Sequence, residues 1–335
     1  MRQVRIYFVI AGVALAVTAC APGGVRNGDD DDIGGHIADA GGNGFIDAVP
    51  FIDASGNVGD GGHNSNGACD KMDILFVIDN SGSMSEEQAN LATNFPAFVQ
   101  VIENYTTSAG THLDYHIGVT TTDHGGAIFG TPDDGQFLVE DRSGLFPTSC
   151  MFPNGRRYLQ KGDTNVGTKF SCAAKAGTSG SPFEMPLQAA KMALVDRMAG
   201  PNASNAGFLR EDALLAIVLL TDENDCSTIG VPGGADDPLT YCDGSHLEVV
   251  NNYITAFDGV KGGERGRWAT AVIAGPGPGI CMSAFGSADE AVRLKQFTTM
   301  TGTNAVFTSI CNGNLAQSLM DAFGTFGVAC ENIPG

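Results

Sequence analysis

The sequence predicts an α/β protein with a doubly wound, mostly parallel sheet and helices on both faces. Two observations lead to this prediction. Strand and helix patterns alternate along the chain from residue 71 onward, which is typical of a parallel sheet with crossover helices. The strand segments are also continuous apolar runs, as at residues 74–78 (ILFVI) and 214–220 (LLAIVLL). Such runs suit strands that are buried on both faces, because a strand with one wet face alternates.

Each element follows from its local pattern. Residues 71–78 predict the first strand, and Leu91, Phe95 and Ile102 recur at helical spacing on one face of the segment after it. Residues 125–180 have a looser pattern, which indicates either an edge strand with a large loop or an insertion. The remaining elements are helices at 86–105, 186–198, 247–257, 289–300 and 315–326, and strands at 113–121, 214–220, 268–274 and 305–310.

Oxygen-bearing side chains follow the first strand. Asp79, Ser81 and Ser83 stand at alternate positions, and Gly82 between them is expected to let the chain turn tightly. Carboxylate and hydroxyl oxygens suit Mg²⁺, Mn²⁺ or Ca²⁺ rather than a soft metal. The plainer interpretation is a loop whose Asp and Ser only cap the next helix. A second apolar run ends in Asp222, and the carboxyl ends of parallel strands are where ligands bind in such sheets.

Asp79-x-Ser81-x-Ser83 after an apolar strand, with Asp222 after a second one, resembles the metal-ion-dependent adhesion site (MIDAS) of the von Willebrand factor type A (vWA) domain. The resemblance covers about residues 69–330 and implies a Rossmann-like fold in which the two strands are neighbours. It also implies a hydroxyl ligand from a third loop, just before a helix. Counting back from that helix indicates Ser181, and Thr178 fits a loop that is one turn longer, so this fifth ligand stays open.

The resemblance implies a binding function. A cation held by hydroxyls and only two carboxylates keeps residual positive charge and an exchangeable position. By analogy with the family, a carboxylate of a partner protein or surface polymer completes its coordination, and the function is adhesion or protein–protein interaction. The alternative is a structural scaffold domain whose metal site is non-functional. Glu223 and Asp225 either tune the surroundings of the metal or belong to an exposed charged loop.

An enzyme is the less favoured alternative. A magnesium-dependent phosphatase of the haloacid dehalogenase type also carries an Asp after its first strand, but it needs a second Asp two residues later as general acid. Ser81 occupies that position, so Asp79 could accept a phosphoryl group while nothing protonates the leaving group. The sequence also has no Gly-x-Ser-x-Gly and no Gly-Lys pair. We therefore expect no enzymatic activity and no catalytic residue.

Charge limits the classes of partner. The chain has 38 acidic and 18 basic residues and a formal net charge of −20. Nucleic acids and anionic membrane surfaces require clustered Lys and Arg, and no such cluster occurs. We expect contact with a membrane only through a lipid anchor.

The first residues predict export. Residues 1–20 resemble a lipoprotein signal peptide, with Arg2 and Arg5 before a short apolar stretch and Cys20 as the lipidated residue. Ala21 favours sorting to the bacterial outer membrane, with the protein periplasmic or surface-exposed. Residues 21–66 are rich in Gly and Asp and poor in large apolar residues, which predicts a disordered tether. Residues 67–335 then form the vWA domain, with the insertion at about 125–180.

Eight cysteines remain besides Cys20, an even number that predicts disulfides in an exported chain. The sequence alone permits many pairings. The resemblance implies that the two ends of the domain lie close together, which pairs Cys69 with Cys330. The other predicted pairs are Cys150 with Cys172, Cys226 with Cys242, and Cys281 with Cys311.

Overall fold

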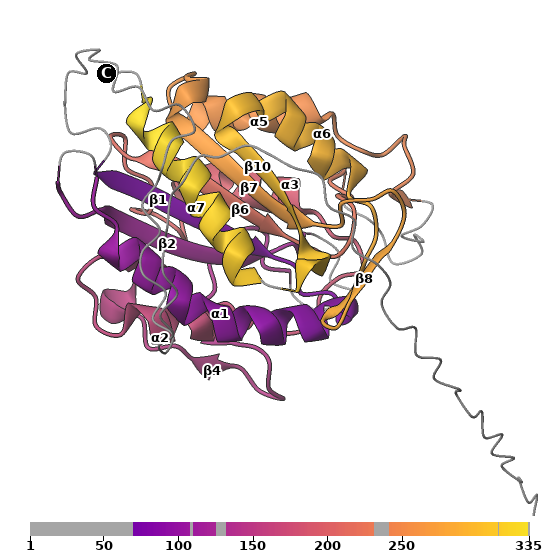
Figure 1. Ribbon diagram of the computed structural model, residues 1–335, viewed down its shortest axis with the longest axis horizontal. Helices are drawn as coiled ribbons and strands as arrows, with labels where there is room; N and C mark the ends of the chain where they lie inside the picture. The colour runs from indigo at the N-terminus through magenta and orange to yellow at the C-terminus, as the bar shows by residue number, and fades with distance from the viewer. Residues whose placement is uncertain (1–69, 108–109, 125–131, 231–240, 314, 334–335) are drawn as a thin grey trace, which may run out of the picture. The chain divides into compact units, whose positions relative to one another are not determined.

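A six-stranded sheet forms the centre of the computed structural model, which describes residues 70–107, 110–124, 132–230, 241–313 and 315–333 (Figure 1). Its strands lie in the order β10, β7, β6, β1, β2, β5. All neighbours are parallel except β5, which is antiparallel to β2. Their bounds are β1 (Lys71–Ile78), β2 (Asp114–Thr121), β5 (Leu159–Gln160), β6 (Leu214–Leu220), β7 (Trp268–Ala274) and β10 (Ala305–Ser309). The prediction of an α/β protein with a mostly parallel sheet is confirmed.

The helices are α1 (Ser85–Asn104), α2 (Val166–Ala173), α3 (Pro186–Lys191), α5 (Val250–Val260), α6 (Val292–Thr301) and α7 (Leu315–Glu331). A π-helical segment, Met192–Asp196, continues α3. Two small hairpins lie outside the main sheet: β3 (Glu140–Asp141) with β4 (Thr148–Ser149), and β8 (Cys281–Ser283) with β9 (Gly286–Ala288). In the described part of the chain, no helix is long and apolar enough to cross a bilayer.

The two faces of the sheet belong to different hydrophobic cores. Ile74 and Phe76 of β1 lie in one core with side chains of α1, α2 and α7, and α7 lies in front of the sheet in Figure 1. Leu75 and Val77 lie in the other core with side chains of α3, α5 and α6. Consecutive residues of a strand point to opposite faces, so a strand between two helix layers must be apolar at every position.

The segment 125–180 is more ordered than its loose pattern predicts. Its described part contains β5, an edge strand as in one of the two predicted alternatives, and also the β3–β4 hairpin and the helix α2, which the sequence pattern does not predict. Phe170 of α2 is fully buried, with ring centroids 4.9 Å from Phe76 and 4.5 Å from Phe95. Burying an aromatic side chain contributes about 2 kcal/mol or more, so tertiary packing stabilises a helix whose eight residues would be marginal alone.

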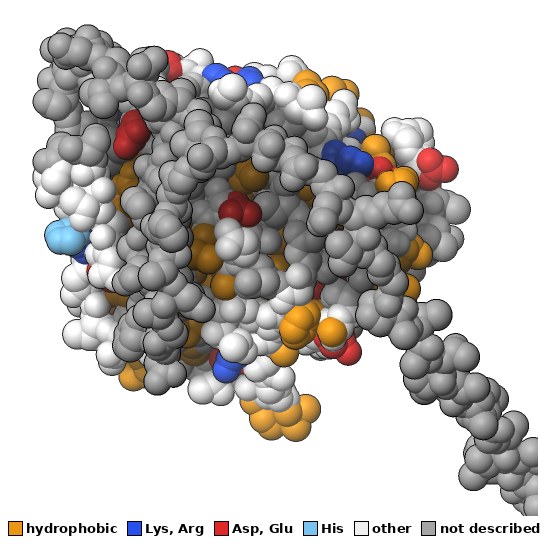
Figure 2. Space-filling view, in the orientation of Figure 1, with side chains coloured by type: hydrophobic (Ala, Val, Ile, Leu, Met, Phe, Trp, Pro, Cys, Tyr) orange, Lys and Arg blue, Asp and Glu red, His pale blue; other side chains and the backbone are white. Residues whose placement is uncertain are grey.

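The same segment carries an exposed apolar tip. Leu145 and Phe146, between β3 and β4, are 91% and 77% exposed. In Figure 2, hydrophobic side chains project at the lower edge, where this hairpin lies in Figure 1. Basic side chains are scattered over the face shown in Figure 2.

Three predicted disulfides are confirmed: Cys150 with Cys172, Cys226 with Cys242, and Cys281 with Cys311. The fourth prediction pairs Cys330, which is buried, with Cys69, which lies outside the described residues. So do Cys20, the predicted signal peptide and the predicted tether. Disulfides persist in oxidising compartments, which indicates an exported or extracellular protein.

Candidate metal centre

The register of the sheet brings three strand ends to one edge. Ile78 of β1 pairs with Leu220 of β6 and with Thr121 of β2. The Asp79 N–H continues this ladder by donating to the Leu220 carbonyl at 2.9 Å. Residues that directly follow these strands therefore lie together, as parallel pairing requires.

Asp79 is fully buried, and the loops around it hold its carboxylate. Its Oδ1 accepts the Ser81 N–H at 2.8 Å, and its Oδ2 accepts the Thr221 hydroxyl at 2.5 Å. Burial raises the pKa of Asp79 to about 6, and the bonds from Thr221 and Ser81 oppose that rise. Thr221 thus orients Asp79 from the neighbouring strand, a role that the sequence analysis does not assign to it.

The two serines of the motif contact each other. The Ser81 and Ser83 hydroxyl oxygens are 2.9 Å apart. Ser81 is buried while Ser83 is exposed, so the pair runs from the interior toward solvent. Gly82 is not required for this turn, because an added Cβ would meet nothing within 4 Å and its φ is not in the left-handed region. The expected role of Gly82 in a tight turn is therefore wrong.

Asp222 lies on the other side of this motif. It is 2% exposed, and its Oδ1 has no hydrogen-bond partner among the described residues. Burial, and after it the negative charge of Asp79, raise the pKa of Asp222 to about 8, while a hydrogen bond from Ser83 opposes the rise. An unpartnered carboxylate oxygen away from water is costly unless a proton or a cation compensates it.

The third loop is held against the end of β1. The Gln88 side chain on α1 donates to the Asp79 carbonyl at 2.8 Å and to the Gly177 carbonyl at 2.5 Å, and accepts the Gly177 N–H at 3.1 Å. Further along, the Gly180 N–H donates to the Asn80 carbonyl at 2.8 Å. A Cβ on Gly180 would lie 2.5 Å from the Asn80 side chain, so any larger residue at position 180 would force that side chain to move.

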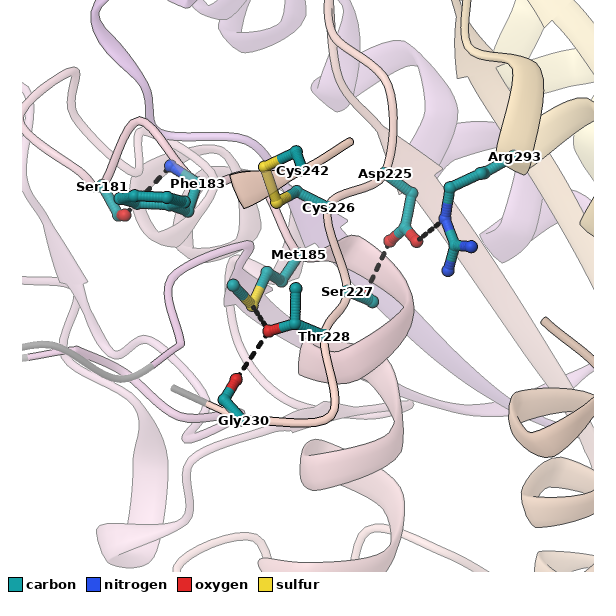
Figure 3. The surroundings of a disulfide bond; sticks show 10 residues. All are labelled: Ser181, Phe183, Met185, Asp225, Cys226, Ser227, Thr228, Gly230, Cys242 and Arg293. Carbon is teal, nitrogen blue, oxygen red and sulfur yellow. Dashed lines mark hydrogen bonds and ion pairs between the residues drawn. A yellow bond between two sulfur atoms is a disulfide. The ribbon is translucent and has the colours of Figure 1, made fainter. Parts of the chain in front are cut away.

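The two hydroxyls proposed from this loop differ in position. Thr178 is exposed, whereas Ser181 is buried. The Ser181 Oγ accepts the Phe183 N–H at 3.0 Å (Figure 3). The Ser181 N–H donates to Asp123 at 2.6 Å. Asp123 also accepts the Asn80 side chain at 2.9 Å. Within the described residues, no hydrogen bond joins either hydroxyl to Asp79 or Asp222.

Two buried glutamates near this edge are not predicted from the sequence. Glu87 is 3% exposed and Glu184 is 2% exposed, and each has one carboxylate oxygen with no hydrogen-bond partner in the described residues. Burial raises the pKa of Glu87 to about 7 and that of Glu184 well above its ordinary value. The burial of Glu184 could have been inferred from its place between apolar residues just before a helix, in the sequence PFEMPL.

Asp225 has a structural role. Its carboxylate is 3.0 Å from Arg293 Nε and accepts the Ser227 hydroxyl at 2.6 Å (Figure 3). The exposed-loop alternative for Asp225 is therefore wrong, because Asp225 is buried, and its role in tuning the surroundings of a metal stays a prediction. Glu223 is half-buried, and its side chain contacts Glu184.

The donor set fits a hard cation. In the described part of the chain, no Lys, Arg or His nitrogen lies within 4.0 Å of a carboxylate oxygen of Asp79, Glu184 or Asp222. Nor do any three His, Cys, Asp or Glu side chains there come close enough to hold a metal by themselves. A cation at this edge would therefore need hydroxyl ligands as well, as Ser81 and Ser83 provide.

No protein-family model and no curated protein match this sequence. Among solved structures, the chain is similar to proximal thread matrix protein 1 from the mussel byssus, with 14% identity, a TM-score of 0.38 and coverage of 76% of this chain and 48% of that one. It is also similar to the pilus adhesin SpaC from Lactobacillus rhamnosus GG in its open conformation, with 14% identity, a TM-score of 0.40 and coverage of 76% and 30%. The chain thus spans less than half the length of either. Both TM-scores are too low to establish a shared fold or function.

Proposed function

We propose that this chain is a vWA domain with a doubly wound sheet, and that Asp79, Ser81, Ser83 and Asp222 hold one divalent cation at its carboxyl edge. The observation that carries the proposal is the Asp222 Oδ1, which is buried without a hydrogen-bond partner beside Asp79 and Ser83. A bound Mg²⁺, Mn²⁺ or Ca²⁺ would compensate this oxygen. The domain then acts as a binding module, and we expect no catalysis.

The partner is a protein or surface polymer that presents a carboxylate. The cation supplies a positive charge at which a carboxylate oxygen binds. Ser83 is the exposed member of the site, so a partner approaches from its side. The acidic surroundings repel acidic partners in general and select one carboxylate on a complementary surface.

The β8–β9 hairpin supports a protein as the partner. The Asp289 N–H, just after β9, donates to the Asp222 carbonyl at 2.8 Å, which ties this hairpin to the site. Ile280 and Met282 at the hairpin are 67% and 82% exposed. Exposed apolar side chains beside a polar anchor are typical of protein interfaces.

A structural cation is the second candidate. Asp79, Ser81 and Asp222 are 0%, 4% and 2% exposed, and a cation among them would be largely enclosed by the chain. In that case the cation would stabilise the loops without meeting a partner. Capture of a partner carboxylate separates the two candidates.

Isothermal titration of Mg²⁺, Ca²⁺ and Mn²⁺ into the full-length, disulfide-bonded chain tests the site. We expect one ion to bind per chain, and Asp79→Ala and Asp222→Ala to abolish binding while their circular dichroism is unchanged. Asp321→Ala, at an exposed position of α7, should bind as the unmodified chain does. Absence of binding to the unmodified chain would refute the metal site.

Partner capture is tested with immobilised peptides that present a single Glu, each matched by a peptide with Gln at that position. We expect cation-dependent capture on Glu peptides, reversed by chelator and absent on the Gln peptides. Cation binding without any such capture would favour the structural candidate.

We further propose that Cys20 anchors the exported chain to the outer membrane through lipid. Radiolabelled palmitate should be incorporated into the chain but not into Cys20→Ser. Incorporation into the variant, or fractionation of the unmodified chain away from the outer membrane, would count against this anchor.

A further inference from the structure

The backbone holds Glu184 beside the metal centre. The Cys226 N–H, in the loop after Asp222, donates to the Glu184 carbonyl at 2.7 Å. The N–H of the next residue, Met185, donates to the carbonyl of Thr122 at the end of β2 at 3.3 Å. Glu184 is therefore fixed between two strand ends of the carboxyl edge, immediately before α3.

The surroundings of the Glu184 side chain are acidic. It is 2% exposed, and its Oε1 has no hydrogen-bond partner among the described residues. The charged groups that act on it most strongly are Asp79 and Glu223, and both are acids. A buried carboxylate among acids is unfavourable unless a proton or a cation joins the group.

Neither predicted hydroxyl of the same loop is placed like Glu184. Ser181 Oγ accepts the Phe183 N–H at 3.0 Å, and Thr178 is exposed. Among the donors of this loop, Glu184 is the one that both interacts with Asp79 and has an unpartnered oxygen.

We propose that Glu184 supplies the third-loop ligand of the cation site, directly or through one bound water, in the place where the sequence predicts a hydroxyl. This proposal rests on the proposed metal site. The cation then lies among three carboxylates, those of Asp79, Asp222 and Glu184, with the hydroxyls of Ser81 and Ser83 between them. The hydroxyls and water are needed because no three of the described acidic side chains form a compact ligand set by themselves.

This ligand set favours Ca²⁺ over Mg²⁺. Ca²⁺ accepts six to eight oxygens in irregular geometry and tolerates several carboxylates, whereas Mg²⁺ requires a near-ideal octahedron and retains water. A glutamate has a longer and more flexible side chain than Ser or Thr, so it suits the larger and less regular coordination sphere. A third carboxylate also neutralises more of the charge of the cation, and a partner carboxylate must compete with Glu184 for it.

Titration of Ca²⁺ and of Mg²⁺ into the full-length chain tests the proposal with three variants. Glu184→Gln removes the charge at nearly constant shape, Glu184→Asp keeps the charge on a shorter side chain, and Glu211→Gln removes an exposed charge just before β6, at the opposite edge. We expect Glu184→Gln to weaken Ca²⁺ binding about 10- to 100-fold, the range for residues that support a bound metal. Mg²⁺ binding should weaken less, so the preference for Ca²⁺ falls. Glu184→Asp should retain part of the affinity, and Glu211→Gln all of it.

The outcomes separate this inference from the proposed function. If the unmodified chain binds Ca²⁺ and Glu184→Gln binds it equally well, the role of Glu184 is refuted and the site of Asp79 and Asp222 stands. If the unmodified chain binds neither cation, both are refuted. Thermal unfolding in chelator is the control that Glu184→Gln is folded. Its melting temperature should be no lower than that of the unmodified chain, because the substitution removes a buried carboxylate that has no basic partner.

Discussion

The buried carboxylates at the two edges of the sheet have neighbouring charges of opposite sign. Near the amino end of β1, Asp73 is fully buried and accepts the Arg210 N–H at 2.6 Å and its Nε at 2.7 Å. At the carboxyl edge, Asp222 is almost equally buried, yet the largest charges acting on it come from other acids, Asp79 first. Burial raises the pKa of Asp73 to about 6 against the opposing charge of Arg210, and that of Asp222 to about 8.

This difference shows that neighbouring charges, rather than burial, distinguish the two edges. The amino edge is neutralised within the chain, since Lys261 also contributes positive charge near Asp73. The carboxyl edge has no such residue within 4.0 Å of the carboxylates of Asp79, Asp222 or Glu184 among those described, since Arg293 pairs with Asp225 instead. Its acids must bind either protons or an external cation, which gives the proposed function its physical basis.

Removing the positive charge of Arg210 should have the largest effect on stability. Arg210→Met leaves Asp73 buried without its partner, which typically costs about 3–5 kcal/mol. We expect a loss of that size in the free energy of unfolding measured with urea, with cation affinity unchanged. Lys71→Met is the matched control, because the Lys71–Asp212 pair is exposed and contributes little. A loss as small as that of the control would mean that Asp73 is not stabilised by Arg210.

The disulfide beside the site should matter for both stability and binding. Replacing Cys226 and Cys242 by Ser opens a link with a sequence separation of 16, worth about 3 kcal/mol. Because the Cys226 N–H holds the Glu184 carbonyl, we also expect weaker cation binding in titrations. Replacing Cys150 and Cys172, with a separation of 22, should cost similar stability without changing cation affinity. Equal effects of the two pairs on affinity would contradict this link to the site.

Neutralising one acid at each edge should have effects of opposite sign. In chelator at pH 7, Asp222→Asn removes an acid whose raised pKa opposes folding, and we expect a gain of at least about 1 kcal/mol, the equivalent of one pKa unit of that rise. Asp73→Asn leaves Arg210 without its carboxylate and should destabilise. Urea unfolding of both variants measures the comparison. A loss of stability in both would indicate that Asp222 is satisfied within the chain.

The free energy of unfolding in chelator should also depend on pH. The pKa values of Asp79, Glu87 and Asp222 are raised to about 6, 7 and 8, above those of unfolded Asp and Glu. The folded chain therefore holds extra protons between about pH 4 and pH 8, and in chelator its stability falls as the pH rises through this window.

The slope should stay below about 1.4 kcal/mol per pH unit for each acid. Asp222→Asn should reduce the slope near pH 8, and saturating Ca²⁺ should reduce it over most of the pH range. The part due to Asp73 remains, since its pKa is also raised to about 6. Denaturant unfolding at several pH values measures this slope, and stability that rises with pH in chelator would contradict the prediction.

The sequence by itself determined the five parallel strands of the main sheet. Strand Trp268–Ala274 has the predicted bounds, because a strand between two helix layers is apolar at every position and is recognisable locally. The oxygen donors after residues 78 and 220 were predictable for the same reason: they follow directly where an apolar run ends. Three disulfides were also predicted correctly.

Only the tertiary structure decided what surrounds those donors. Asp225 is buried and pairs with Arg293, 68 residues away, and Asp73 pairs with Arg210 across 137 residues. Glu184 has an acidic environment because folding holds it between the ends of β2 and β6, near Asp79 and Glu223. Local periodicity records whether a position is buried, but the sign of the charge that meets a buried side chain depends on segments brought together by folding.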